Sequence, residues 1–463
     1  MRDDTPAISD PRHIHVVGVG GAGMSAIAEV LAAMGHTVTG SDLKASAGLD
    51  RLTALGVGVR VGHSADHISG AELLTRSTAV PDRNSECRAA REAGIPVFTR
   101  AEILAAICGE RETIAVAGTH GKTTTASMLA LVLREAGLRP SFIIGGDVNE
   151  IGTGAAWDDG RLFVVEADES DGSFLLLPRK LGVVTNLEPD HLEHHGGYEE
   201  LQRAFRRFVE ETDGPALVGV DDEGGRSLAV ESGAVSIGTT LPADWMIHDL
   251  EESWEGVRFS LTGPDRSPLA IELPLPGVHN ARNAATAAAA GMLMGADSES
   301  VARALARFGG VARRFEQRGR SAGVVFVDDY AHLPTEVSAT VGAARSGNWN
   351  RLVAVFQPHR YSRTENLWRG FAEVFDGVDV LFVTDVYPAG EVPRAGVSGN
   401  LIAEAVRGAC PDQVVHYVPR REELIGQLGG LLSEGDLCLT MGAGDLTSVP
   451  DEVRSLLDAR SGG

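Results

Sequence analysis

The chain has 463 residues, of which 43% are hydrophobic and 23% charged, as expected for an ordinary globular protein of about three domains. Its formal net charge of −23 excludes the basic face that binding to nucleic acid or to an anionic membrane requires. Its four cysteines form no CxxC motif, its charged N-terminus lacks the apolar core of a signal peptide, and no apolar stretch of about 18 residues occurs. We therefore expect a cytoplasmic protein that does not insert into a membrane.

The first predicted domain, residues 1–110, opens on a glycine-rich loop. An apolar strand at 13–17 leads into Gly18–Gly23, a helix follows over 24–34, and a second strand at 36–40 ends beside Asp42. The loop matches G-x-G-x-x-G with an acidic residue about 20 positions further on, the pattern of a dinucleotide site. Any anion held at a helix start needs the same glycines, so three interpretations stay open: NAD, strand–helix packing without a ligand, or another phosphate such as a diphosphate.

The second predicted domain, residues 111–312, opens on a phosphate-binding loop. A strand at 113–117 runs into Gly118-Thr119-His120-Gly121-Lys122-Thr123-Thr124, and a helix begins within the threonines, although Val116 replaces the first glycine of the strict motif. Amides at such a helix start bind phosphate, the lysine reaches the outer phosphates, and the first threonine hydroxyl ligates Mg2+. Only three of the 41 Lys and Arg residues are lysines, so a lysine here indicates that a compact ammonium is needed. The sequence therefore predicts use of a nucleoside triphosphate.

Two acidic segments follow the buried strands predicted at 162–165 and 181–185. They are Glu166–Asp171 and Asn186–His191, at the strand ends where open α/β sheets bind ligands. Carboxylate and imidazole groups there suit a divalent metal that bridges phosphates. A solvated loop is the simpler interpretation of either segment alone, but two of them after a phosphate loop favour the metal. The histidines from His191 to His195 also admit zinc, although the run is not HExxH and no cysteine lies nearby.

The third predicted domain, residues 313–463, follows an alanine-rich helix over 284–294 and a Gly-Gly linker. Strands at 324–327, 352–356, 380–383 and 437–439 predict another mostly parallel sheet, so the whole chain is expected to be α/β with three sheets covered by helices. Polar segments follow two of these strands, and in the second of them Arg360 and Arg363 lie three positions apart. On a helical turn they share a face and suit a carboxylate, with plain surface placement as the alternative.

Nine segments in order resemble the Mur ligases of bacterial cell-wall synthesis, over nearly the full chain: HIHVVGVGGAGMS, GHSADHI, AVAGTHGKTTT, EADESD, TNLEPDH, PGVHNARNA, RRFEQRG, VDDYAH and FQPHRYSRT. The resemblance implies an N-terminal Rossmann-like domain for a UDP-sugar, a central P-loop ATPase-like domain, and a C-terminal Rossmann-like domain for an amino acid. GGAGMS and FQPHRYSR point within the family to the member that adds L-alanine.

The resemblance also implies the reaction. L-Alanine would be joined to the carboxylate of UDP-N-acetylmuramate at the expense of ATP, through an acyl phosphate and a tetrahedral intermediate, with release of ADP and phosphate in peptidoglycan precursor synthesis. Mg2+ is the expected metal, with Mn2+ as an alternative. The partners would be these small molecules, and the protein would be a monomer or a homodimer.

The site residues that the resemblance implies fall into five groups. The UDP-sugar would be bound by Gly18, Gly20, Gly21, Ala22, Gly23, Met24, Ser25, Asp42 and His63. ATP would be bound by Gly118, Thr119, His120, Gly121, Lys122, Thr123, Thr124, Asn280, Asn283, Arg314 and Asp329. The metal would be held by Thr123, Glu166 and His191, and L-alanine by Tyr330, His332, His359, Arg360 and Arg363. The chemistry would fall to Lys122, Glu166, His191, Arg314 and His332, with His332 or His359 accepting a proton from the amine.

Two positions depart from the family pattern. Leu333 stands where a second histidine is usual, and Arg206 stands where several sibling ligases have a carbamylated lysine, which excludes a carbamate bridge. Three alternatives remain: a nicotinamide-dependent dehydrogenase built on the first loop, a non-catalytic nucleotide-binding switch, and a recycling ligase that joins a whole peptide to the same sugar nucleotide.

Overall fold

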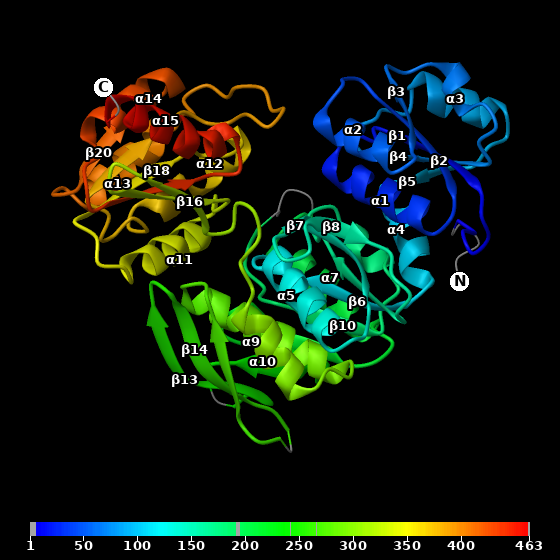
Figure 1. Cartoon of the computed structure of the whole chain (residues 1–463), viewed down its shortest axis with the longest axis horizontal. Coiled ribbons are helices and arrows are strands. Elements are labelled where there is room, and N and C mark those ends of the chain that lie inside the picture. Colours follow the sequence, from blue (N-terminus) through cyan, green and yellow to red (C-terminus); the bar gives the residue numbers. More distant parts are fainter. Residues whose placement is uncertain (1–5, 191–194, 241, 265, 462–463) are drawn as a thin grey trace. The chain divides into compact units, whose positions relative to one another are not determined.

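The computed structural model describes residues 6–190, 195–240, 242–264 and 266–461 (Figure 1). It contains three sheets, mostly parallel and accompanied by helices, so the predicted α/β class is confirmed. The chain divides into two compact units. One comprises Met1–His248, Ser260–Ile271 and Arg282–Phe308, and the other comprises Asp249–Phe259, Glu272–Ala281 and Gly309–Gly463. The proposed domain limits after residues 110 and 312 stay predictions.

The first sheet has the strand order β3-β2-β1-β4-β5, and all its neighbouring strands are parallel. Its strands are β1 (His13–Val17), β2 (Thr37–Asp42), β3 (Gly58–Val61), β4 (Leu73–Arg76) and β5 (Val97–Thr99). The helices of this region are α1 (Ala22–Ala33), α2 (Ala47–Ala54), α3 (Ser85–Glu92) and α4 (Arg100–Gly109). Because β1 lies between β2 and β4, the order of the strands changes direction at β1. The glycine loop follows β1 at the carboxyl edge of the sheet, where such folds bind ligands. Helix α1 begins two residues before the predicted start.

The second sheet has ten strands in the order β15-β14-β13-β12-β11-β10-β6-β9-β7-β8. Its strands are β6 (Glu112–Ala117), β7 (Ser141–Val148), β8 (Thr153–Ala156), β9 (Leu162–Glu166), β10 (Leu181–Val184), β11 (Ala216–Gly219), β12 (Val235–Gly238), β13 (Trp245–Ser253), β14 (Gly256–Thr262) and β15 (Leu269–Leu273). The helices are α5 (Lys122–Glu135), α7 (Tyr198–Glu210), α8 (Glu223–Ser232), α9 (Val278–Leu293) and α10 (Ser298–Ala306). Strand β6 lies between β10 and β9 and is parallel to both, so the phosphate loop and the two acidic segments share one edge of the sheet.

The third sheet has the order β16-β17-β21-β18-β19-β20, with only β16 antiparallel to its neighbour. Its strands are β16 (Glu316–Ser321), β17 (Val324–Asp329), β18 (Arg351–Phe356), β19 (Val380–Val383), β20 (Val414–Tyr417) and β21 (Asp436–Met441). The helices are α11 (Pro334–Arg345), α12 (Tyr361–Leu367), α13 (Asn400–Ala409), α14 (Arg421–Leu431) and α15 (Val449–Ser461). Alternate residues of β17 and β18 enter two separate apolar clusters, one containing residues of α11 and α13 and the other residues of α14 and α15. Burial on both faces explains why these strands are continuous apolar runs.

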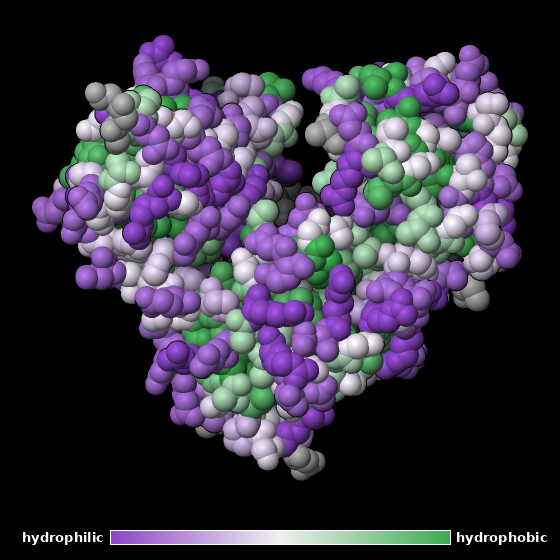
Figure 2. Space-filling view, in the orientation of Figure 1, coloured by the Kyte–Doolittle hydropathy of each residue, from purple (hydrophilic) through white to green (hydrophobic). Residues whose placement is uncertain are grey.

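The surface is predominantly polar on the face drawn in Figure 2, where apolar residues are scattered among hydrophilic ones. Within the described part of the chain, no helix combines the length and the apolar character needed to cross a bilayer.

Candidate functional site

The phosphate loop is closed around Lys122 at the start of α5. The Lys122 Nζ donates to the carbonyls of Gly118 (2.6 Å) and Thr119 (3.2 Å) and lies 2.9 Å from the Glu169 carboxylate. Burial disfavours the charged ammonium, but the Glu169 carboxylate outweighs this effect and raises the pKa of Lys122. The ammonium is therefore kept protonated at the amino end of a helix, where phosphate also binds. Glu169 belongs to a predicted acidic segment, but its partnership with Lys122 was not foreseen.

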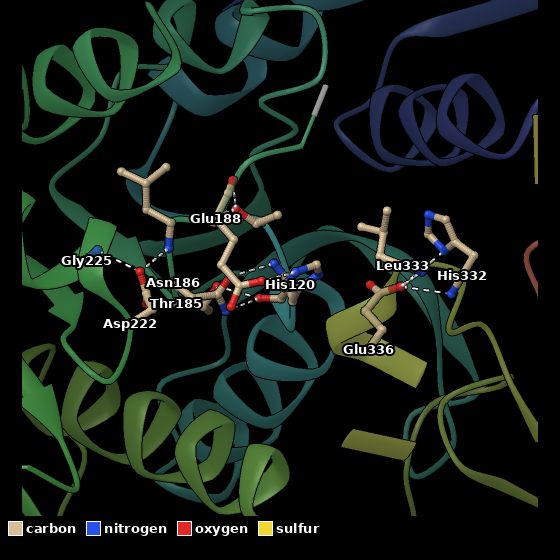
Figure 3. A network of polar contacts seen from close by, with 12 residues as sticks. His120, Thr185, Asn186, Glu188, Asp222, Gly225, His332, Leu333 and Glu336 are labelled. Atoms are coloured by element: carbon tan, nitrogen blue, oxygen red, sulfur yellow. Dashed lines mark hydrogen bonds and ion pairs between the residues drawn. The ribbon is translucent and has the colours of Figure 1, made fainter. Parts of the chain in front are cut away.

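The segment after β10 lies beside the loop and contacts His120 (Figure 3). Asn186 Oδ1 accepts from the His120 amide at 2.8 Å, and Thr185 Oγ1 donates to the His120 carbonyl at 2.5 Å. The His120 ring lies 3.1 Å from the Glu188 carboxylate. Thr185 and Asn186 thus fix the backbone of the phosphate loop and Glu188 contacts a side chain of it, while the metal-binding role predicted for the segment from Asn186 to His191 stays a prediction.

Two hard oxygen donors meet at the carboxyl end of β9. The Thr123 hydroxyl lies 3.0 Å and 3.1 Å from the two carboxylate oxygens of Glu166, and Glu166 also accepts from the Gly145 amide at 2.8 Å. Hydroxyl and carboxylate oxygens are the ligands that Mg2+ prefers, so this pair fits the expected metal. His191, the third predicted ligand, lies outside the described residues, as does most of the histidine run for which zinc was considered.

Helix α9 contributes Asn283 to the loop. The Asn283 Oδ1 lies 3.3 Å from the Thr125 hydroxyl, and a Cβ added to Gly121 would be only 2.4 Å from the same oxygen. Gly121 also has φ +78°, so glycine is required here for both conformation and space. The second predicted asparagine, Asn280, is buried and its amide donates to the Pro276 carbonyl at 2.7 Å. Thr124 is buried within α5.

A cavity of about 490 Å³ connects the glycine loop with the end of β9. Its lining includes Gly20, Ala22, Gly23 and Ser25 together with Glu166 and Asp168. The Met24 side chain is packed in the core, so only its backbone faces a ligand. Volumes of roughly 300–1,000 Å³ are typical of small-molecule sites. Two glycines of the loop and Glu166, one of the candidate metal ligands, thus line the same cavity.

Arg100, the first residue of α4, also lines this cavity and was not predicted as a site residue. Gly23 lacks a side chain, and a Cβ there would be 3.0 Å from the Arg100 Nε. This Nε is buried without a hydrogen-bond partner among the described residues. A guanidinium beside the start of α1 adds its charge to the attraction of the helix start for an anion. The sequence signal for it was the capping box Thr99-Arg100-Ala101-Glu102, which predicts a helix starting at Arg100.

Asp42 and His63 both lie near the glycine loop, as predicted. The Asp42 carboxylate accepts from the Gly20 amide at 2.9 Å, and the His63 Nδ1 lies 3.1 Å from both the Ser41 hydroxyl and the Glu86 carboxylate. Glu86 is fully buried and accepts from Ser41 (2.6 Å). His67 lies 2.8 Å from it and His15 lies 3.8 Å from it. No group of His, Cys, Asp or Glu among the described residues has the arrangement of a metal site, so this cluster is a hydrogen-bond network.

The Glu86 carboxylate should make stability depend on acidity. Burial favours its neutral form, but the nearby His15 ring and the hydrogen bonds from Ser41 and His67 lower the pKa of Glu86 from 4.5 to about 2. A depressed pKa adds stability above pH 4.5, roughly 3 kcal/mol here, which is lost as the pH falls through about 2. We expect Glu86→Gln to flatten the pH dependence of the unfolding free energy between these limits, as measured by urea denaturation. Glu92→Gln, on the exposed end of the same helix, should leave it unchanged; equal flattening in both variants would contradict the assignment.

The third sheet brings together Arg314, Tyr330 and Asp329. Arg313 and Arg314 each place a guanidinium over the Tyr330 ring, at 5.0 Å and 4.9 Å. The Asp329 carboxylate accepts from the amides of Phe315 and Ala331, both at 2.7 Å. Burial raises the pKa of Asp329 to about 6, although Arg314 and the two amides favour its charged form. Asp329 therefore holds the turn that presents Arg314 and Tyr330.

The predicted amino-acid residues lie at the ends of β17 and β18. The ring centroids of His332 and His359 are 5.8 Å apart, and His359 stacks on Tyr387. Arg360 precedes α12 with φ +70°, a strained conformation for a residue with a side chain, and Arg363 lies within the first turn of the helix. Leu333, at the departure from the family pattern, is buried, and its amide donates to Glu336 at 3.2 Å.

Comparisons with known proteins cover most of the chain. Residues 13–112 match the catalytic domain of the Mur ligase family, residues 116–291 the Mur ligase middle domain, and residues 313–444 the Mur ligase domain described as the glutamate ligase domain. The chain belongs to the Mur ligase family. It is therefore an ATP-dependent ligase with the three-domain α/β architecture of that family.

Individual relatives of this Mur ligase agree with the family match. The UDP-N-acetylmuramate–L-alanine ligase of Anaeromyxobacter sp. is 44% identical over 97% of the chain and 99% of its own length. The crystal structure of UDP-N-acetylmuramate-alanine ligase from Thermotoga maritima has a TM-score of 0.79 at 28% identity, covering 97% and 99% of the two chains. A MurF ligase of the same organism, crystallised with ADP, has a TM-score of 0.64 at 17% identity, covers 91% and 95% of the chains, and shares the fold.

Arg206, which replaces the lysine of some Mur ligases, forms an ion pair with Glu231 of α8. The Arg206 guanidinium is thus paired with a carboxylate on the protein surface.

Proposed function

We propose that this Mur ligase joins L-alanine to the carboxylate of UDP-N-acetylmuramate, with conversion of ATP to ADP and phosphate. The observation that carries the proposal is the single cavity lined by the glycine loop, Arg100, Glu166 and Asp168. A sugar nucleotide whose diphosphate lies at the glycine loop can extend its acid group toward the phosphate loop in this cavity. The 44% identity to an alanine-adding ligase supports the choice of substrates.

The first compact unit would supply the phosphoryl-transfer groups. ATP phosphates would bind the amides from Gly118 to Thr124 and the Lys122 ammonium. Asn283, which contacts the loop through Thr125, would lie near the adenine. Thr123 and Glu166, with His191, would hold Mg2+, which when bound neutralises charge on the β- and γ-phosphates. The UDP-sugar diphosphate would bind the α1 start from Gly18 to Ser25 and the Arg100 guanidinium, with Asp42 and His63 nearby.

The second compact unit would supply the amino-acid groups. Arg360 and Arg363 would bind the carboxylate of L-alanine, and Tyr330, His332 and His359 would surround its amine and methyl group. Arg314, held over Tyr330, would reach the γ-phosphate, while Asn280 and Asp329 would lie near the adenine and ribose. We propose a cytoplasmic enzyme that acts as a monomer or a homodimer, with Mn2+ as an alternative to Mg2+.

The reaction would proceed in two steps. A carboxylate oxygen of the sugar nucleotide attacks the γ-phosphorus, and the bond to the β-phosphate oxygen breaks, giving an acyl phosphate and ADP. The amine of alanine then attacks the acyl carbon, and the tetrahedral intermediate collapses to an amide and inorganic phosphate. The first step depends mainly on positioning and charge neutralisation, which Lys122 and Arg314 provide as fixed cations.

The test is phosphate release from ATP and Mg2+ with UDP-N-acetylmuramate, in the presence and absence of L-alanine. We expect sustained release only when both substrates are present. Release that is indifferent to the sugar nucleotide would contradict the proposal and favour a nucleotide-binding switch. Turnover with the peptide Ala-Glu-diaminopimelate in place of alanine would favour the recycling ligase, and a change in NADH fluorescence on mixing would favour the dehydrogenase.

A further inference from the structure

The hydrogen bonds of His332 determine which of its ring nitrogens carries a proton. The Nδ1 lies 3.1 Å from the Tyr330 carbonyl and 3.2 Å from the Glu336 carboxylate. The Glu336 carboxylate also accepts from the amides of His332 (3.0 Å) and Leu333 (3.2 Å) at the start of α11, where a helix favours negative charge (Figure 3). A carbonyl and an ionised carboxylate only accept hydrogen bonds, so Nδ1 must donate. In the neutral ring, Nε2 therefore bears the lone pair.

The neighbouring His359 has the opposite arrangement. Its Nδ1 lies 3.1 Å from the Arg363 Nη1, and a guanidinium can only donate. The proton of neutral His359 is therefore on Nε2. Burial, with His332 and the two arginines nearby, lowers the pKa of His359 to about 3, so this ring stays neutral at physiological pH. His359 thus has its lone pair already engaged and offers a donor at Nε2.

We propose that Glu336 is a positioning residue that keeps His332 in its Nδ1–H tautomer, so that Nε2 of His332 accepts the proton from the amine of the incoming amino acid. This rests on the proposed ligase function and selects between the two histidines considered from the sequence. The alanine ammonium loses one proton to Nε2 and becomes a neutral amine. Its lone pair forms the C–N bond, the C–O bond to phosphate breaks, and the second proton leaves with the departing phosphate. The Nε2–H group of His359 would instead donate a hydrogen bond to an anion.

Three variants separate this role from the support that Glu336 gives to its helix. Glu336→Ala removes the carboxylate acceptor for Nδ1–H, leaving only the Tyr330 carbonyl at 3.1 Å, and also removes the acceptor for the two amides. Glu336→Gln retains a carbonyl oxygen that can accept from the same groups, so it should rescue much of the loss. Asp297→Ala removes the N-cap of α10, whose carboxylate accepts from the Ser300 amide at 2.8 Å. This hydrogen bond does not involve a histidine. The variant reproduces the loss of a helix cap alone.

The first measurement is 15N NMR of the full-length protein labelled at histidine, with the His332 signals assigned from a His332→Gln sample. We expect a protonated Nδ1 and an unprotonated Nε2 in the wild type and in Glu336→Gln. In Glu336→Ala, where only the Tyr330 carbonyl remains beside Nδ1, part of the proton population should move to Nε2. A wild-type ring protonated on Nε2 only, or a Glu336→Ala ring with an unchanged tautomer, would overturn the proposal.

The second measurement compares two nucleophiles for the acyl phosphate. Hydroxylamine is already a neutral nucleophile, so hydroxamate formation from ATP and UDP-N-acetylmuramate needs no proton acceptor, whereas ligation of alanine does. We expect Glu336→Ala to lower ligation about 10–100-fold, less than the roughly 10²–10⁴-fold effect of losing a general base itself, and to leave hydroxamate formation unchanged. Asp297→Ala should change neither rate. Equal loss of both reactions in Glu336→Ala would overturn the role in proton transfer. Absence of hydroxamate in the wild type would refute the ligase function itself, and with it this role.

Discussion

Lys122→Ala should lower phosphate release at least 10²–10³-fold, the usual effect of removing one fixed group that stabilises charge in the transition state. The Lys122 ammonium lies within the phosphate loop, 2.6 Å from the Gly118 carbonyl, and is thus fixed at the place where the phosphates would bind. Initial rates of phosphate release with saturating UDP-N-acetylmuramate and alanine measure the effect. A loss smaller than tenfold would contradict the position of the lysine at the transferring phosphate.

The same substitution leaves Glu169 as a buried carboxylate without its cation. The Glu169 side chain is only 2% exposed, and removing one member of a buried pair typically costs about 3–5 kcal/mol. The matched control is the double variant Lys122→Ala/Glu169→Gln, in which the unpaired charge is removed. We expect it to recover most of the unfolding free energy in urea titration while phosphate release remains lost. Recovery of activity together with stability would mean that the lysine has only a structural role.

Gly121→Ala should abolish measurable ATP binding. A Cβ at this position would be 2.4 Å from the Asn283 Oδ1, and the backbone has φ +78°, so both the loop and α9 would have to move. The amides from Gly121 onward would then no longer point together at the phosphates. Isothermal titration of the variant with ATP and Mg2+ measures the loss.

Gly137→Ala provides the control for backbone strain alone. Gly137 has φ +72°, close to the value at Gly121, but no atom lies within 4 Å of its added Cβ. We expect it to cost about 1 kcal/mol of unfolding free energy and to leave ATP binding intact. If Gly121→Ala also bound ATP normally, contact with Asn283 would not limit the geometry of the loop.

Local pattern was enough to predict most of the elements. The strands at 13–17 and 380–383 have the predicted bounds. Each is a short apolar run bounded by polar residues or glycine, and such a run is too short for a helix, so both the type and the length of the element follow from the local sequence. The meander β13–β15 was not predicted. Burial in β13 alternates only partly and its end is exposed, so its hydrophobic signal is weak.

The sequence by itself determined the α/β class, the phosphate loop, and the ends of strands at which polar residues gather, since each depends on neighbours within a few positions. The family assignment likewise followed from ordered short motifs. The pairing of polar side chains was decided only by the tertiary structure. Lys122 meets Glu169 47 positions away, Thr125 meets Asn283 158 positions away, and Arg100 enters the cavity because Gly23 makes room for it. The tautomers of His332 and His359 likewise depend on which acceptor or donor lies within about 3 Å. Hydrogen-bond geometry at that scale arises from packing and is not encoded in any local pattern.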